Sequence, residues 1–300
     1  MRFSNLTSGY AFPATALALD TETVARYLWA TQDDNALYWR DGAVYLVPPL
    51  AVAALAFRGI AQEVALAPGS LHTGQELLFR RLVTVGERLT AQAHVTAGSR
   101  RRGFVALAID LAATDESGET ALSGSATLMV AGSQDRATAG ARRPAVETQA
   151  DAHEPVAYPA LAPPALVVDQ ELGPLVRTAT QERIDQYAAA SGDYNPIHVD
   201  PAFAARSPFG GTVAHGMLLL AYLSTLLTQA FGLAWLQTGA LRVKFRNPAP
   251  AGTTVTARGR VERVEEGHGV QYAVCAVRLE NAAGEALMTG EARVDVKEVP

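Results

Sequence analysis

The chain has 300 residues, of which 49% are hydrophobic and 18% charged, as in a globular protein of one large or two ordinary domains. Its formal net charge of -5 argues against a nucleic-acid partner, whose phosphates favour a basic face. The only cysteine, Cys275, excludes an internal disulfide and, with no signal-peptide pattern at the N-terminus, predicts a cytoplasmic location.

The first elements along the chain are a polar turn and an apolar segment. Residues 31–38 read Thr-Gln-Asp-Asp-Asn-Ala-Leu-Tyr, and residues 43–57 that follow carry no charge. The basic cluster at residues 99–103 predicts a solvated hairpin tip, with a phosphate contact as the alternative. Residues 131–166 are rich in alanine, proline, glycine and charge, which is typical of a linker. We therefore expect domains at residues 1–132 and 167–300, joined by a linker at 133–166.

The second half begins with a short helix, predicted over residues 180–190 with Thr178 or Thr180 as its N-cap. A turn follows at residues 191–198, and residues 207–241 then carry no Asp, Glu, Lys or Arg. Polar residues such as His215 interrupt this stretch, so it predicts a buried helix and no membrane span. Strands are predicted at about residues 240–246, 253–265, 270–281 and 286–296, with alternation clearest from Leu241 to Arg246. One apolar helix followed by antiparallel strands indicates an α+β fold with the sheet wrapped around the helix.

The sequence contains an internal repeat, in which the second half has the same order of elements as the first. Asp193 and Tyr187 stand 160 positions after Asp33 and Tyr27, within similar turn sequences. From Phe79 and Phe245 onward the spacing is 166, and glycines recur at matched positions, which indicates matched turns. The matched glycines are Gly86 and Gly252, Gly118 and Gly284, and Gly124 and Gly290.

The turn at residues 191–198 carries the chemistry. It reads Ser-Gly-Asp-Tyr-Asn-Pro-Ile-His, which places a carboxylate, Asp193, and an imidazole, His198, five positions apart. A tight turn can hold two such groups at a fixed separation, and together they can move protons on a water molecule or a substrate carbon. The alternative is structural: Asp193 alone could cap the turn, as we expect of Asp33.

This turn, followed by Val213-Ala214-His215-Gly216-Met217, resembles the signature of MaoC-like dehydratases and R-specific enoyl-CoA hydratases, which have the hotdog fold. The resemblance covers about residues 168–296. The first half resembles the degenerate N-terminal hotdog of fused members, which implies a double hotdog with two such domains in tandem. It has Tyr38 in place of the histidine, and a phenol of pKa near 10 cannot replace an imidazole as a base. We expect this half to be catalytically silent and to shape the acyl pocket. Its residues Val47-Pro48-Pro49 align with His215-Gly216-Met217.

The resemblance implies reversible syn addition of water to a trans-2-enoyl thioester, giving the R-3-hydroxyacyl thioester. Asp193 and His198 would act on the water, in roles that the sequence leaves open. Asn195 would tie the turn or orient a group, and Pro196 would stiffen it. Gly216 would present a backbone N–H at a helix N-terminus to the developing oxyanion. Substrate contacts are expected from His215, Met217, Pro196 and Tyr194, and we favour a structural role for His215 over a second catalytic one.

Other residues carry weaker signals. His72, His94, His153 and His268 have no supporting constellation, and no His/Cys/Asp/Glu cluster has the spacing of metal ligands, so no metal and no cofactor are expected. Arg242, Lys244 and Arg246 lie on one strand and either contact the phosphates of coenzyme A or face solvent. The expected partners are an acyl-CoA or acyl-carrier-protein substrate and a second copy of the chain in a homodimer.

Two other functions remain open at this stage. A hotdog thioesterase would hydrolyse the acyl thioester with a carboxylate and water, without needing an imidazole at this spacing. A module that binds acyl thioesters without turnover would keep the motif passively. The acyl chain length, the carrier, the direction of the reaction and the pathway do not follow from the sequence.

Overall fold

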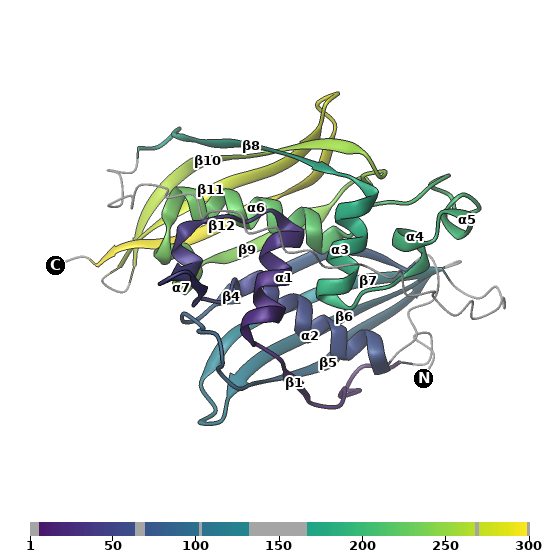
Figure 1. Cartoon of the computed structure of the whole chain (residues 1–300), viewed down its shortest axis with the longest axis horizontal. Coiled ribbons are helices and arrows are strands. Elements are labelled where there is room, and N and C mark those ends of the chain that lie inside the picture. Colours follow the sequence, from purple (N-terminus) through teal and green to yellow (C-terminus); the bar gives the residue numbers. More distant parts are fainter. Residues whose placement is uncertain (1–5, 64–69, 102–103, 132–166, 268–269, 299–300) are drawn as a thin grey trace.

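The computed structural model describes residues 6–63, 70–101, 104–131, 167–267 and 270–298, so the expected linker lies outside the described residues. A ten-stranded antiparallel sheet has the order β1-β5-β6-β7-β4-β9-β12-β11-β10-β8. In Figure 1 the two halves of this sheet form a lower and an upper wing, and the helices lie on the side that the wings enclose. The two expected domains thus share one sheet, and the boundaries given for them stay a prediction.

Each half contributes five strands to this sheet and its own helices, and β2 and β3 of the first half pair with each other in a separate two-stranded sheet. The first half contains β1 (Thr15–Leu17), α1 (Thr21–Thr31), the 3-10 turn η2 (Ala36–Tyr38), β2 (Trp39–Arg40), β3 (Ala43–Val44), α2 (Pro49–Glu63), β4 (Leu71–Phe79), β5 (Leu89–Arg101), β6 (Phe104–Asp115) and β7 (Thr120–Ala131). The second contains β8 (Glu171–Ala179), α3 (Gln181–Ser191), α4 (Pro196–Val199), α5 (Pro201–Ala204), α6 (Gly216–Phe231), α7 (Leu233–Thr238), β9 (Ala240–Phe245), β10 (Thr253–Gly267), β11 (Val270–Asn281) and β12 (Ala286–Glu298).

The internal repeat predicted from the sequence is confirmed in the sheet. Strand order is the same outward from the centre in both wings, so that β4 matches β9, β7 matches β12 and β5 matches β10. The predicted strands and the helix at 180–190 are present within two or three residues, and Thr180 is the N-cap, since its side chain accepts from the Arg183 N–H. Strands β1 and β8, which form the two edges of the sheet, were not predicted.

The two wings meet where β4 pairs with β9. The register places Gly74 opposite Lys244 and Leu78 opposite Ala240, with Glu76 opposite Arg242 at the centre. Glu76 and Arg242 are matched positions of the repeat, so the local two-fold axis passes between them. Arg242 Nε donates to Glu76 Oε1 over 2.6 Å. Two copies of one ancestral residue have therefore become a complementary ion pair across the seam.

The long charge-free segment of the second half forms α6, which is buried on nearly all sides, as predicted for a helix that the sheet surrounds. Its counterpart α2 packs against it and against the first wing. Among the described residues, none of the helices has the length and apolar character needed to cross a membrane. The N-terminus of α6 lies next to the turn at residues 191–198, since His215 Nε2 lies 2.9 Å from the Asp193 carbonyl oxygen, and this positions the site.

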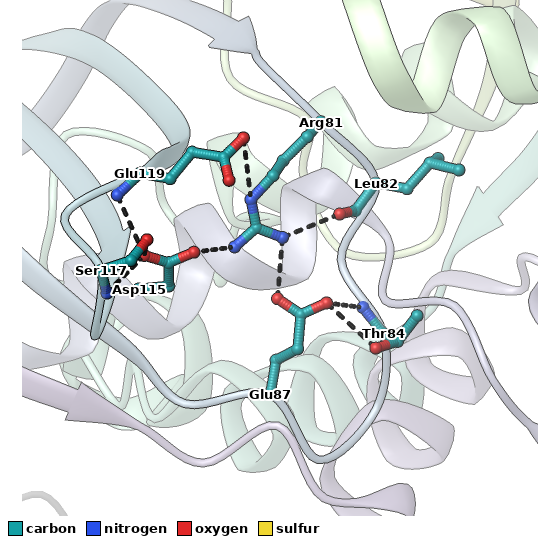
Figure 2. A network of polar contacts seen from close by, with 7 residues as sticks. All are labelled: Arg81, Leu82, Thr84, Glu87, Asp115, Ser117 and Glu119. Atoms are coloured by element: carbon teal, nitrogen blue, oxygen red, sulfur yellow. Dashed lines mark hydrogen bonds and ion pairs between the residues drawn. The ribbon is translucent and has the colours of Figure 1, made fainter.

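Equivalent corners of the two wings are braced by different chemistry. Figure 2 shows Arg81 between the β6–β7 hairpin and the loop before β5, bonded to Glu87 at 2.8 Å and to Asp115 at 3.0 Å. In the second wing the matched positions are Asn247 and Asn281. Asn281 Oδ1 accepts from two backbone N–H groups of its hairpin, as Asp115 Oδ1 does, so the turn is kept without the charge.

Candidate active site

A chain of hydrogen bonds fixes the turn that carries Asp193. Helix α3 ends at Ser191, and Gly192 follows in the left-handed region at φ 77°. The Ser191 hydroxyl donates to the Tyr187 carbonyl at 2.7 Å and accepts from the Asp193 N–H at 3.2 Å. Asp193 Oδ1 accepts from the Asn195 N–H at 3.1 Å. The carboxylate therefore has one oxygen committed to its own turn, which sets its orientation.

The next step of the turn positions His198. Asn195 Oδ1 caps α4 by accepting from the Ile197 N–H at 3.3 Å, and Pro196 occupies the first turn of that helix. Asn195 thus ties the turn, which was one of its two expected roles. His198 Nδ1 lies 2.7 Å from the Val213 carbonyl oxygen. Because a carbonyl only accepts, Nδ1 carries the proton and Nε2 presents a lone pair.

The structure brings Asp193, His198 and His215 together. One nitrogen or carboxylate oxygen of each lies within 4.8 Å of the others, a set that the spacing in the sequence did not predict. The two imidazoles lie nearly face to face, with ring centroids 3.8 Å apart and planes inclined by 31°. Atoms at these separations can each lie about 2.8 Å from one water oxygen.

The pKa values of the group are shifted by its surroundings. Burial pushes the pKa of Asp193 up, but His215, His198 and the Asn195 N–H together outweigh it and hold the pKa below its usual value. Burial lowers the pKa of His198, against the opposing charge of Asp193. Near neutral pH the carboxyl is thus ionised and the His198 imidazole is neutral. Neither group then carries a proton that it could give to a substrate.

Gly216 begins α6, and no side chain caps this helix end. Its backbone N–H is therefore one of the donors that a helix N-terminus leaves without an intrahelical partner. A Cβ added at Gly216 would lie 2.8 Å from Phe245 Cε1, so the glycine is required by the phenyl ring beside it. The structure thus adds a packing reason for this glycine to the backbone donor that was expected of it.

A cavity of about 340 Å³ opens over these groups. Six of the eight predicted site residues line it: Asp193, Asn195, His198, His215, Gly216 and Met217. Tyr194 and Pro196 belong to the turn that holds Asp193 and His198 and are not among the residues that line the cavity, so their contacts with substrate stay a prediction. Of the three basic strand residues, Arg246 lines the cavity, while Arg242 is bound to Glu76.

Three further residues at the cavity were missed in the sequence. Tyr187 from α3 is buried beside His215, with ring centroids 5.0 Å apart. His72 and Arg58 come from the first half. Burial lowers the pKa of His72 to about 4, and its ring lies 4.7 Å from that of Phe245. The statement that His72 has no supporting constellation was therefore wrong, because β4 carries it into the cavity across the seam.

Arg58 joins the two halves at the turn itself. Its side chain packs so closely on Gly192 that a Cβ there would lie 2.7 Å from Arg58 Cδ. Only a glycine combines this contact with a positive φ. The first half therefore supports the second half's turn as well as lining the cavity.

The matched turn of the first half is filled by its own side chains. The Tyr38 hydroxyl donates to Asp33 Oδ2 at 3.1 Å and lies 3.3 Å from Thr228 Oγ1. Burial raises the pKa of Asp33 to about 6. Helices α2 and α6 begin at Pro49 and Gly216, so Pro48 matches His215, one residue away from the expected alignment. Pro49 has no N–H to present where Gly216 has one.

Known proteins are similar to this chain in sequence and in fold. A family model described as "MaoC like domain" matches residues 166–282. A Mycobacterium tuberculosis protein named 3-hydroxyacyl-thioester dehydratase Z is 38% identical over 34% of this chain and 72% of its own. The (R)-specific enoyl-CoA hydratase of Aeromonas caviae is 38% identical over 36% of this chain and 79% of its own.

Solved structures match nearly the whole chain. A putative MaoC domain dehydratase from Chloroflexus aurantiacus covers 98% of this chain and 96% of its own, with a TM-score of 0.74 and 14% identity. A Mycobacterium tuberculosis protein described as having a double hotdog fold covers 98% and 97%, with a TM-score of 0.69 and 15% identity. These likenesses confirm the predicted double hotdog fold, and together with the sequence relatives they place this chain in the family of MaoC-like dehydratases.

Proposed function

We propose that this protein catalyses the reversible hydration of a trans-2-enoyl thioester, carried on coenzyme A or an acyl carrier protein, to the R-3-hydroxyacyl thioester. The observation that carries the proposal is that Asp193, His198 and the N-terminus of α6 converge on one cavity. Relatives named for this hydration and for the reverse dehydration support it. The carrier, a cytoplasmic location, a homodimer and independence of cofactors stay predictions.

The resting protonation states decide where the protons go. Asp193 is ionised and His198 is neutral, so the pair can accept a proton but has none to give. As the water oxygen bonds to Cβ, the pair takes one proton from the water, and the electrons of the C=C bond move toward the thioester oxygen. The same proton then passes from the pair to Cα. The sum is one added water, and because one pair serves both carbons, both new bonds form on the same face.

The negative charge that develops on the thioester oxygen needs a donor. The Gly216 N–H stands at the positive end of the α6 helix dipole, with no side-chain cap competing for that helix end. A backbone donor fixed in this way stabilises an oxyanion in the transition state more than the neutral carbonyl of the ground state. Loss of one such donor lowers kcat by roughly 10²- to 10³-fold in other enzymes. Val213 stands three residues before Gly216 in the chain, and its carbonyl orients the His198 imidazole, so both groups are positioned by the same segment.

The test is to incubate the protein with crotonyl-CoA and to follow the enoyl absorbance and the free thiol separately. We expect the enoyl absorbance to fall with no release of thiol, and R-3-hydroxybutyryl-CoA to appear. Release of thiol would assign the protein to the thioesterases instead. If neither the enoyl absorbance falls nor thiol is released with enoyl thioesters of several lengths on both carriers, the proposal is overturned. The protein would then be a module that binds acyl thioesters without turnover.

Asp193→Asn provides the decisive variant. It keeps the shape and the acceptor for the Asn195 N–H but removes the charge, so we expect kcat/KM to fall by about 10²- to 10⁴-fold with the affinity for substrate nearly unchanged. Asp33→Asn makes the same change in the matched turn and serves as the control. Equal activity of the Asp193→Asn variant and the wild type would contradict the assignment.

A further inference from the structure

His215 stands at a helix N-cap but does not act as one. Ser, Thr, Asp and Asn are favoured at this position because their side chains accept from the first turn of the helix. The His215 side chain makes no such bond, and the residue is only 1% exposed. The His215 ring is therefore buried at the N-terminus of α6 for a reason other than stabilising the helix end.

The ring is directed at the turn that carries Asp193. His215 Nε2 lies 2.9 Å from the Asp193 carbonyl oxygen, so Nε2 carries the proton and donates it. The other nitrogen, Nδ1, is buried and has no hydrogen-bond partner among the described residues. Burial lowers the pKa of His215, and the charge that His198 would carry lowers it further. His215 is thus held as a neutral ring with one fixed tautomer.

One face of the same ring contacts His198. The centroids of the two imidazoles are 3.8 Å apart, and the Tyr187 ring lies 5.0 Å from His215. His215 therefore touches the backbone of Asp193 and the ring of His198 at once. No described hydrogen bond joins Asp193 and His198 directly, so this bridge and the turn itself set the distance between them.

We propose that His215 is a positioning residue that holds Asp193 and His198 in register over the water and keeps the His198 ring out of bulk solvent. The role rests on the proposed function, because it concerns the two groups that act on the water. It differs from the substrate contact and from the second catalytic base that the sequence left open, because here His215 acts through the Asp193 backbone and the His198 ring.

The role has two parts, and separate substitutions remove each. His215→Phe keeps an aromatic face against His198 and Tyr187 but cannot donate to the Asp193 carbonyl. His215→Gln can donate but has no ring. His215→Ala removes both and leaves a space that free imidazole can enter. The ionisable groups that face the ring are Asp193, His198 and Tyr187, so any shift in titration is assigned among these three.

The experiment measures the pH profile of kcat/KM for enoyl thioester hydration and, independently, the titration of His198 by NMR of histidine-labelled protein. For His215→Phe we expect kcat to fall by roughly 10- to 100-fold because Asp193 is no longer anchored, with the His198 titration unchanged. For His215→Gln we expect a smaller loss of kcat and a His198 titration moved upward, because water reaches the ring. For His215→Ala we expect both effects, and partial rescue by added imidazole.

Two results would overturn this role. One is wild-type kinetics and an unmoved His198 titration in all three variants. The other is a loss of activity that follows the loss of thermal stability equally in all three, with neither the pH profile nor rescue distinguishing them. The NMR titration needs no turnover, so a shifted His198 in a protein that hydrates no thioester would reject the proposed function while keeping the contact.

Discussion

The two polar turns of this chain share a backbone and differ in chemistry. In both, a hydroxyl at the end of a helix bonds back to a tyrosine carbonyl, and an asparagine caps the next short helix. In both, an aspartate lies between these two bonds. In the first turn Tyr38 reaches that aspartate and fills the space, whereas in the second His198 turns to the Val213 carbonyl and a cavity remains.

The pKa values of the two aspartates are consequently shifted in opposite directions, although burial raises both. The pKa of Asp33 rises to about 6, because burial dominates and its partner is a neutral phenol. The pKa of Asp193 falls, because two imidazoles and a backbone N–H offset its burial. The turn is thus a shared scaffold, and we expect three neighbouring positions to decide whether it can act: histidine or tyrosine in the turn, and histidine-glycine or proline-proline at the helix start.

The strongest test of this comparison converts one turn into the other. His198→Tyr gives the second turn the side chain of the first, and a phenol cannot serve as a base near neutral pH. We expect kcat/KM to fall by about 10²- to 10⁴-fold in steady-state kinetics. Tyr38→His is the matched control and should create no second site, since Pro49 offers no N–H. Hydration that survives in the His198→Tyr variant would contradict the role of the imidazole.

The next test removes the N–H of Gly216 and leaves the turn intact. Gly216→Pro copies the first half, and Gly216→Ala is its matched control, because both add a Cβ beside Phe245 but only proline removes the donor. We expect the alanine variant to be more active than the proline variant by roughly 10²-fold in kcat. Equal activities would mean that packing against Phe245, and not the donor, explains the glycine.

A third test uses the buried carboxyl of the first turn. Because folding raises the pKa of Asp33 from 3.8 to about 6, its proton is bound more tightly in the folded state. Its contribution to stability is therefore fully present below pH 3.8 and is lost as the pH rises through 6. Asp33→Asn should be more stable than the wild type above pH 6, by up to about 3 kcal/mol, with a smaller difference near pH 4. Urea unfolding at the two pH values measures this, and a difference independent of pH would contradict it.

The smallest expected effect is at the seam. Glu76→Arg places like charges against Arg242 and should lower the free energy of unfolding by less than about 1 kcal/mol, since both side chains are largely exposed. The double variant Glu76→Arg with Arg242→Glu should recover most of the loss. A double variant no more stable than the single one would show that the pair is not coupled.

The sequence predicted what local patterns and the repeat encode. Alternation gave the long strands of the second half, and the matched turns gave the double fold. Asp193, His198 and Gly216 were predicted to converge, because short stretches with specific residues position all three. The roles of these residues in catalysis stay predictions until they are tested by substitution.

The features that were not predicted from the sequence depend mainly on contacts between segments far apart in the chain. His72 looked isolated because only the β4–β9 contact carries it to the cavity, and Arg58 because α2 belongs to the other half. The edge strands β1 and β8 were missed: β1 has three residues, and β8 contains a glycine and a proline, which weaken a strand pattern.

The pair of Glu76 and Arg242 at the centre of the seam favours pairing between unlike halves, a first half with a second half. Strand β9 offers Arg242 to an incoming edge, and β4 offers Glu76. Two second halves that met through β9 would set guanidinium against guanidinium, and two first halves would set carboxylate against carboxylate. The pair therefore favours a first half that meets a second half over either half that meets a copy of itself.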